Sequence, residues 1–257
     1  MITSLTNSKV KTVRRLLAER RFRQRENSFV AEGSRWLEDV LATGAQPHFC
    51  LVTPDWIDKN QTLASTLTQS SIPHQQIDPA IAQAISDTET APGVFTVLPQ
   101  PDLPWPTNPQ LLLLLDGLQD PGNMGTLIRT ATAAGVSGLI LLPGCVDPFN
   151  PKVTRSTMGT LLRLPLRQIK WDALPQHIGS CCLYLATGDA QTPYTAVPWS
   201  EPAALIIGNE AHGVSQTARN QAHTPIYIPM HNQTESLNAA VAGSVILFEA
   251  VRQSQLA

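Results

Sequence analysis

The stretch that decides the fold is Ile226-Tyr-Ile-Pro-Met230, followed by the loop His231-Asn-Gln-Thr234, then Glu235-Ser-Leu-Asn238, and running on to Arg252. Alternating β-branched and aromatic residues predict a strand, which Pro229 ends. Beyond the loop, helical spacing predicts a long helix with one largely apolar face: Leu237, Val241, Ser244, Val245, Phe248 and Val251. Ser236 and Asn238 lie where that helix begins, so backbone N–H groups and short polar side chains form a mouth suited to a polar ligand. The last strand and helix of any α/β domain would give the same pattern.

The length of 257 residues is sufficient for one large or two ordinary domains. No apolar run approaches the roughly 20 residues that span a bilayer, and no signal-peptide core is present at the N-terminus. Four cysteines without metal-ligand spacing are interpreted as buried, reduced thiols: Cys50, Cys145, Cys181 and Cys182. These features predict a cytoplasmic protein with no membrane segment and no metal.

Positive charge is concentrated near the N-terminus. Residues 9–25 contain eight cationic side chains and one acidic one, a net charge of +7, so the remainder of a chain with net charge −2 carries −9. A basic segment on an acidic body is typical of proteins that bind phosphate backbones. A solvated helix that keeps the protein soluble is the alternative interpretation.

The N-terminal half predicts a small α/β domain. Residues 9–25 are expected to be helical, strands are expected at 29–32, 49–52 and 93–98, and helices at 35–41, 56–69 and 81–85. Five prolines within residues 99–109 predict a semi-rigid linker. The predicted organisation is a basic helical arm (1–26), a substrate-binding domain (27–98), a linker (99–109) and a second domain (110–257).

The second domain alternates strands and helices. Strands are expected at 111–115, 138–142, 164–169, 181–186 and 203–207, and helices at 126–134 and 151–162. This alternation predicts a parallel sheet covered on both faces, with a ligand crevice beyond the carboxyl ends of its strands. The loops 116–125, 208–213 and 229–236 all follow strands and are therefore expected to converge.

Common catalytic signatures are missing from these loops. The sequence has no glycine-rich dinucleotide fingerprint after its first buried strand, no P-loop, no nucleophile elbow and no H-E-x-x-H motif. His212 and His231 have no evident partner and are interpreted as polar loop residues and not as catalytic bases. The remaining set can bind and neutralise phosphate but contains no ordinary nucleophile: Asn123, Arg129, Glu210, Ser236 and Asn238.

Three segments resemble the motifs of the SpoU (TrmH-type) RNA 2′-O-ribose methyltransferases of the SPOUT superfamily. The first is Asp120-Pro-Gly-Asn-Met-Gly-Thr-Leu-Ile-Arg-Thr-Ala131, and the second is Leu205-Ile-Ile-Gly-Asn-Glu-Ala-His-Gly-Val-Ser215. The third comprises Ile228-Pro-Met230, Glu235-Ser-Leu-Asn238 and the helix to Arg252. The N-terminal half resembles, more loosely, the ribosomal-protein-like substrate-binding domain of the family, through Phe29-Val-Ala-Glu-Gly33 and Ala91-Pro-Gly-Val94.

This resemblance implies an α/β SPOUT methyltransferase domain with a deep trefoil knot, beside the smaller N-terminal α/β domain. It also implies a homodimer with the active site near the subunit interface, to which the apolar face of the helix 237–251 could contribute; packing of that face on its own sheet is equally compatible with the sequence. The cofactor would be S-adenosylmethionine, held at Gly208, Ile228 and Leu237 with Asn209 and Met230 beside them.

The catalytic residues implied are Asn123, Arg129, Glu210, Ser236 and Asn238. The family gives the motif-one arginine an activating role, but a guanidinium has no acceptor, so we expect Arg129 to clamp an RNA phosphate and stabilise the developing alkoxide. Asn123 and Asn238 would orient the loop and the ribose, Glu210 would hold Arg129 or a nearby N–H, and Ser236 would order the turn. Further RNA contacts are predicted at Lys9, Lys11, Arg14, Arg15 and Arg21.

The predicted function is therefore methylation of a ribose 2′-hydroxyl in structured RNA, with ribosomal RNA favoured over transfer RNA. A tRNA 2′-O-methyltransferase and a non-catalytic RNA-binding assembly factor of the same fold stay open. A nucleotide-dependent oxidoreductase is disfavoured because the glycine fingerprint is missing.

Overall fold

In the computed structural model, which describes residues 1–222, 224–232, 234 and 236–255, the chain divides into two compact units. The first unit is Met1–Pro101 together with Phe149–Leu162, and the second is Asp102–Pro148 together with Arg163–Ala257. The polypeptide therefore passes between the units three times. This division differs from the predicted boundaries in two places, at the basic segment and at residues 149–162.

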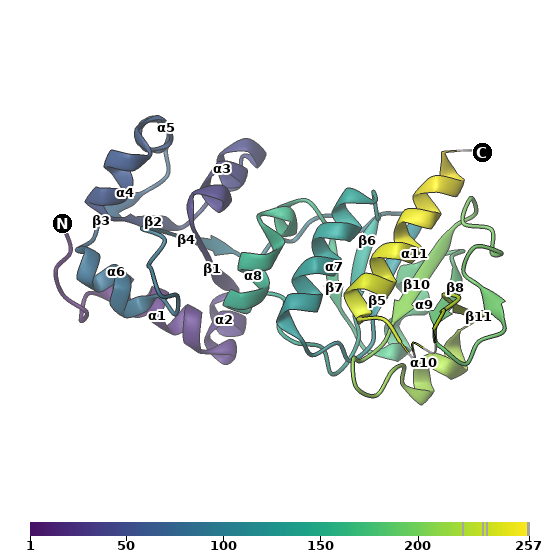
Figure 1. The fold of residues 1–257 in the computed structure, drawn as a ribbon. Coiled ribbons are helices and arrows are strands. Elements are labelled where there is room, and N and C mark those ends of the chain that lie inside the picture. The colour runs from purple at the N-terminus through teal and green to yellow at the C-terminus, as the bar shows by residue number, and fades with distance from the viewer. Residues whose placement is uncertain (223, 233, 235, 256–257) are drawn as a thin grey trace. The chain divides into compact units, whose positions relative to one another are not determined.

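The first unit contains a four-stranded sheet in the order β1-β4-β2-β3 (Figure 1). Its strands are β1 (Ser28–Glu32), β2 (Phe49–Val52), β3 (His74–Gln76) and β4 (Val94–Pro99); β2 and β3 are parallel, and the other pairs are antiparallel. Its helices are α1 (Ser8–Ala18), α2 (Arg20–Glu26), α3 (Ser34–Thr43), α4 (Pro54–Lys59), α5 (Gln61–Gln69) and α6 (Pro79–Ile85). The strands expected at 29–32, 49–52 and 93–98 are confirmed, whereas β3 was missed because His-Gln-Gln carries no strand signal. The helix expected at 56–69 is interrupted at Asn60, where the backbone leaves the helical region.

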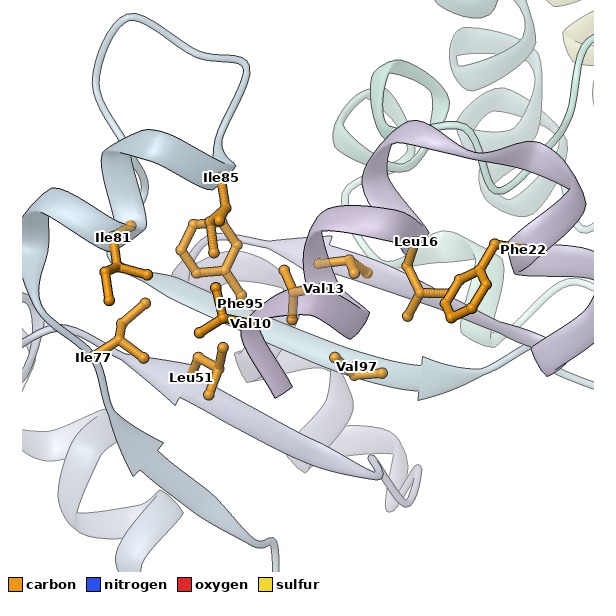
Figure 2. Close-up of a cluster of buried hydrophobic side chains, with 12 residues drawn as sticks. Val10, Val13, Leu16, Phe22, Leu51, Ile77, Ile81, Ile85, Phe95 and Val97 are labelled. Carbon is orange, nitrogen blue, oxygen red and sulfur yellow. The ribbon is translucent and has the colours of Figure 1, made fainter. Parts of the chain in front are cut away.

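The basic segment is an integral part of this first unit. Val10 and Val13 are completely buried and Leu16 is almost so. Figure 2 shows the Val10 side chain beside Phe95 and Leu51 of the sheet, and Leu16 beside the Phe22 ring. The apolar stripe read from the sequence is therefore correct, but it packs into the core of the substrate-binding unit. Residues 1–26 are consequently not a separate arm, because removing them would open this core.

Residues 149–162 complete the other face of the same sheet. The Trp36 indole donates a 2.9 Å hydrogen bond to the Thr154 carbonyl, and the Phe29 and Phe149 rings lie 5.1 Å apart. Arg155 pairs with Glu32 at 3.0 Å and with Asp87 at 2.6 Å.

The helix expected at 151–162 is split in two. It forms α8 (Pro151–Thr157) and a 3-10 turn, η1 (Thr160–Leu162). Between them the backbone takes positive φ at Met158 and Gly159, which breaks the helix.

The second unit is built on a seven-stranded, entirely parallel sheet in the order β7-β6-β5-β10-β8-β11-β9, as the alternating pattern predicted. Its strands are β5 (Leu111–Leu115), β6 (Gly138–Leu141), β7 (Leu166–Gln168), β8 (Cys182–Ala186), β9 (Thr192–Pro193), β10 (Ala203–Ile207) and β11 (Thr224–Tyr227). β11 ends at Tyr227, one residue before Ile228, which the sequence pattern predicts to be in the strand. The helical elements are α7 (Pro121–Ala133), η2 (Trp171–Ala173), α9 (Pro175–Ile178), α10 (Gln216–Gln221) and α11 (Ala239–Ser254).

Helix α7 begins five residues earlier than predicted. Pro121 occupies its first turn, and the Asp120 carboxylate accepts a 2.7 Å hydrogen bond from the Asn123 N–H. Proline at the start of a helix and aspartate at its N-cap outweigh the two glycines that suggested a loop. Asn123 is therefore on a helix and not in a flexible loop.

Helices α7 and α11 lie side by side over one face of this sheet, while α10 helps to cover the other (Figure 1). A Cβ at Gly243 would lie 2.6 Å from Leu127, so α11 approaches α7 through its small residues. The buried residues of α11 are Ala240, Gly243, Ile246, Leu247, Glu249 and Ala250. The apolar stripe predicted from Leu237 to Phe248 consequently stays largely exposed.

The trefoil knot implied by the family resemblance stays a prediction. Among the described residues, no helix has the length and apolar character needed to cross a membrane.

Candidate functional site

A cavity of about 340 Å³ opens at the carboxyl ends of β8, β10 and β11 in the second unit. Its walls are the loops that follow these strands, together with the first turns of α11. The expectation that strand-end loops of the parallel sheet converge is thus met for the 208–213 loop and for the described part of 229–236. Gln233 of the loop 231–234 and Glu235 of the third motif lie outside the described residues.

The tight turn after β10 forms one wall. Asn209 and Gly213 exchange backbone hydrogen bonds of 2.8 and 2.9 Å. Gly208 packs so closely on this turn that a Cβ would lie 2.5 Å from the Gly213 carbonyl. The Asn209 amide also bridges loops, because its Nδ2 donates to Gly117 O at 2.7 Å and its Oδ1 accepts from the N–H groups of Ala211 and His212. The side chain of Asn209 is thus occupied in shaping the wall.

Glu210 joins this turn to α7. Its carboxylate accepts hydrogen bonds from the backbone N–H groups of Gln119 (3.1 Å) and Asp120 (2.9 Å) and from Asn123 Nδ2 (3.0 Å). Partial burial raises the pKa of Glu210, but hydrogen bonds from Asn123 and from backbone N–H groups outweigh burial and bring the pKa below its usual value. Glu210 is therefore an ionised acceptor that fixes the first motif, and it is poorly suited to act as a base near neutral pH.

Asn123 and Asn238 extend the network to α11. Asn238 Nδ2 donates to Asn123 Oδ1 at 2.9 Å, while Asn238 Oδ1 caps α11 by accepting from the N–H groups of Ala240 and Val241. One chain of hydrogen bonds thus links the three motif segments through Glu210, Asn123 and Asn238. Both asparagine side chains are oriented by neighbours whose donor and acceptor roles are fixed.

Asp116 is a contributor that the sequence did not single out. It is buried at the end of β5, and its carboxylate accepts a 2.7 Å hydrogen bond from the Ser215 N–H at the cap of α10. This contact ties the end of the 208–215 loop to the strand beside it. Thr187 and Gly188 also line the cavity without having been predicted. Their position directly after β8 was the available signal, since the same strand-end rule applies.

The structure gathers the predicted cofactor residues at one place. All five, together with Glu210 and Ser236, line the cavity: Gly208, Asn209, Ile228, Met230 and Leu237.

Arg129 is placed differently. It lies on the exposed face of α7, six residues beyond Asn123 and therefore about 9 Å along the helix axis. It makes no hydrogen bond or ion pair with any residue that the structure describes, so Glu210 holds the neighbouring N–H groups and not the guanidinium.

The other predicted RNA contacts are on α1 and α2 of the first unit. Within the described part of the chain, Lys11, Arg14 and Arg21 are exposed and have no ion-pair partner. Arg15 is paired with Glu19 at 3.0 Å and stacks on the Phe22 ring, and Lys9 lies 5.2 Å from the Phe49 ring centre. The unpaired cations are therefore the better candidates for phosphate contacts.

All four cysteines are free thiols; Cys50 and Cys181 are buried as predicted, whereas Cys145 and Cys182 are only partly buried. Burial raises the pKa of the Cys50, Cys145 and Cys181 thiols to about 11, which keeps them protonated. Across the residues that the structure describes, no group of three or more His, Cys, Asp or Glu side chains could hold a metal ion.

Comparison with known proteins agrees with this geometry. Residues 110–248 match the model of the SpoU rRNA Methylase family, and residues 7–96 match the MRM3-like substrate binding domain. An uncharacterized tRNA/rRNA methyltransferase of Synechocystis is 35% identical, covering 98% of this chain and 93% of the relative. The 23S rRNA (guanosine(2553)-2′-O)-methyltransferase RlmP of Bacillus subtilis is 31% identical, covering 96% and 97%.

Solved structures of RNA methyltransferases also resemble this protein over nearly the whole chain. The AdoMet-bound rRNA methyltransferase of Sinorhizobium meliloti superposes with a TM-score of 0.85 at 28% identity, covering 98% of this chain and 97% of that chain. The second and third motif segments line one cavity, hydrogen bonds through Asn123 join the first segment to both, and a family model matches more than half of the sequence. The chain belongs to the SpoU rRNA methylase family.

Proposed function

We propose that this protein transfers a methyl group from S-adenosylmethionine to a ribose 2′-hydroxyl of ribosomal RNA. The observation that carries the proposal is the cavity itself, which is lined by all five positions expected to hold the cofactor. It adjoins the hydrogen-bonded chain of Glu210, Asn123 and Asn238, which orients the segments around it.

The residues present fit S-adenosylmethionine. The wall at Gly208 is made by backbone atoms in close approach, and apolar side chains such as Ile226 and Ile246 face the same space. Exposed backbone N–H and C=O groups suit an adenine edge and ribose hydroxyls, while the apolar lining suits the base. When bound, S-adenosylmethionine supplies an already activated methyl group, so the protein has to position the acceptor hydroxyl and help to remove its proton.

Arg129 is the residue assigned to the acceptor side. Its exposed guanidinium has no partner among the described residues, which leaves its planar donor fork available for an RNA phosphate. A phosphate held in this way would bring the ribose to the mouth beside Asn238 and place positive charge near the developing alkoxide. Asn123 and Asn238 would orient the sugar, with their amide groups fixed by Glu210 and by the start of α11.

RNA binding is further assigned to the exposed cations of α1 and α2, with Lys11, Arg14 and Arg21 foremost. Ribosomal RNA is preferred as the substrate class because a family relative that spans the whole chain, RlmP, is named for 23S rRNA. Release of counterions from RNA phosphates makes this contribution sensitive to salt.

We also propose that the protein works as a homodimer through the exposed stripe of α11. Leu237, Val241, Val245 and Phe248 are between 37% and 51% exposed and follow one side of the helix. An apolar patch of this kind is typical of a protein–protein interface, and a twofold axis would pair the stripe with its own copy.

The test is transfer of labelled methyl from S-adenosylmethionine to total RNA, followed by mapping of 2′-O-methylation in cells with and without the protein. Arg129→Ala should fold and bind S-adenosylhomocysteine as the parent does, while turnover falls by roughly 10²–10³ because one preorganised donor is lost. Arg129→Lys should recover little turnover, since it keeps the charge without the planar fork.

Three results would contradict the proposal. If the methyl label appears in tRNA and not in rRNA, the substrate is tRNA. If the parent protein binds RNA but transfers no methyl group, the protein is an assembly factor. Near-parental turnover of Arg129→Ala would remove Arg129 from catalysis.

A further inference from the structure

Three side chains tie one wall of the cavity to helix α10. Arg219 of α10 donates from Nη1 to both carboxylate oxygens of Asp189, at 3.0 and 3.3 Å, and from Nη2 to Thr187 Oγ1 at 3.3 Å. The Thr187 hydroxyl in turn donates to Asp189 Oδ1. The three residues, here called the 187–189–219 clasp, form a closed ring of hydrogen bonds.

The clasp joins one wall to a helix that continues from another wall. Thr187 and Gly188 directly follow β8 and line the cavity. Arg219 lies on α10, which continues from the 208–215 wall and is anchored at its start by the contact between Asp116 and Ser215. Arg219 therefore holds the wall after β8 to the helix that continues from the wall after β10.

Besides the clasp, two backbone hydrogen bonds hold this segment: the Thr187 N–H donates to the Ile226 carbonyl at 2.9 Å, and the Ala190 N–H donates to the Thr187 carbonyl at 3.5 Å. The segment connects β8, which ends at Ala186, with β9, which begins at Thr192, and it contains Gly188, at which a Cβ would meet no atom within 4 Å. Hydrogen bonds from Thr187 and from Arg219 lower the pKa of Asp189, so the carboxylate is charged and the ring is complete near neutral pH. A loop ordered before a ligand arrives does not have to be ordered during binding, and this improves affinity.

We propose that Arg219 is a positioning residue for the cofactor, which keeps the Thr187–Gly188 wall in its binding conformation through Asp189 and Thr187. The inference rests on the proposed function, because it takes the ligand of the cavity to be S-adenosylmethionine. Arg219 itself does not line the cavity, so its effect on the ligand is indirect.

The experiment compares the parent with Arg219→Ala, Arg219→Lys, Asp189→Ala and the Arg219→Ala/Asp189→Ala double variant. Affinity for S-adenosylhomocysteine is measured by calorimetry, and KM for S-adenosylmethionine and kcat by methyl transfer. Arg219 and Asp189 have 38% and 65% of their side-chain surface exposed, and exposed ion pairs are weak, so we expect Kd and KM to rise by about twofold to fivefold. The value of kcat should stay unchanged, because binding of the cofactor is weakened equally in the ground state and in the transition state.

The variants also test the mechanism. Arg219→Lys keeps the ion pair with Asp189 but cannot hold Thr187 with a second nitrogen, so it should recover part of the affinity. The double variant should match the single ones, because either substitution already opens the ring. Asn220→Ala is the matched control. Asn220 lies on the same helix and is exposed, and among the described residues its side chain hydrogen-bonds only with Gln216, so the Kd of the variant should equal that of the parent.

A Kd for Arg219→Ala equal to that of Asn220→Ala would overturn the inference. The inference would also be overturned if the increase in Kd of the double variant equalled the product of the increases in the two single variants. A fall in kcat with KM unchanged would overturn it as well. If the parent protein does not bind S-adenosylhomocysteine, the proposed function itself is contradicted. This outcome differs from failure of the Arg219 inference alone, because the parent and all variants would then behave alike.

Discussion

Gly208 offers the sharpest test of how the cavity wall is built. A Cβ at this position would lie 2.5 Å from the carbonyl carbon and oxygen of Gly213 and 2.6 Å from the Val214 nitrogen. These are backbone atoms, so no side-chain rotation can relieve the overlap. Gly208→Ala must therefore displace the turn that Asn209 and Gly213 close with hydrogen bonds of 2.8 and 2.9 Å.

The magnitude follows from that turn. Each backbone hydrogen bond contributes about 0.5–1.5 kcal/mol, so losing both costs about 1–3 kcal/mol, which is also the usual cost of overpacking. If the displaced turn must be restored before the ligand binds, the Kd for S-adenosylhomocysteine rises by roughly 5-fold to 150-fold. If the cost instead falls on folding, the melting temperature drops by about 2–4 °C for each kcal/mol.

Calorimetric titration and thermal melting of Gly208→Ala measure both outcomes. Gly188→Ala is the control for stability, because it adds the same methyl group in the same cavity where no atom lies within 4 Å of the new Cβ. It should melt as the parent does. A Gly208→Ala variant with parental affinity and the melting temperature of Gly188→Ala would refute the close-approach reasoning.

Three further perturbations address the network, the RNA face and the dimer. Asn238→Ala removes the cap of α11 and the hydrogen bond to Asn123, so stability should fall by about 0.5–2 kcal/mol in thermal melts and methyl transfer should fall with it; unchanged turnover would exclude a positioning role for Asn238. Lys11→Glu combined with Arg14→Glu should weaken RNA binding and flatten the slope of log affinity against log salt, without changing cofactor affinity; an unaltered slope would return α1 to the solvated-helix interpretation. Val241→Asp combined with Phe248→Asp should convert a dimer to a monomer in sedimentation experiments, and an unchanged molecular mass would place the subunit interface elsewhere.

Helical periodicity was informative about the existence of α1 and α11 but not about their partners. In α1 the stripe of Val10, Val13 and Leu16 is the buried side, yet nothing in the sequence shows that it packs on Phe95 of a sheet formed much later in the chain. Helix α11 is apolar on two sides, and the sequence left open whether the side with the larger side chains packs on its own sheet or meets a second subunit; in the structure that side is not the packed one. Close approach of α11 to α7 requires small residues such as Gly243, which leaves Val241 and Phe248 outside.

The candidate site was predictable where a strand-end loop also carried a motif. Gly208 and Leu237 line the same cavity, as the parallel sheet and the family resemblance indicated. The wall at Thr187 and Gly188 was not predicted, because it presents mostly backbone and carries no motif. The ion pair between Asp189 and Arg219 joins residues thirty positions apart, and such a pairing depends on the strand order, which the sequence does not display.

The contribution of Phe149–Leu162 to the first unit has a consequence for synthesis of the protein. The last residue of the preceding segment of that unit is Pro101, so 61 further residues must be made before Leu162 is available. At about 5–20 residues per second, the ribosome needs roughly 3–12 s for this interval. Throughout it, Trp36 lacks the Thr154 carbonyl and Phe29 lacks the Phe149 ring, so an aromatic surface stays open while β5, α7 and β6 are already emerging. The domain that is translated first is therefore completed after part of the second has been made, and the nascent chain carries this uncovered aromatic surface during that time.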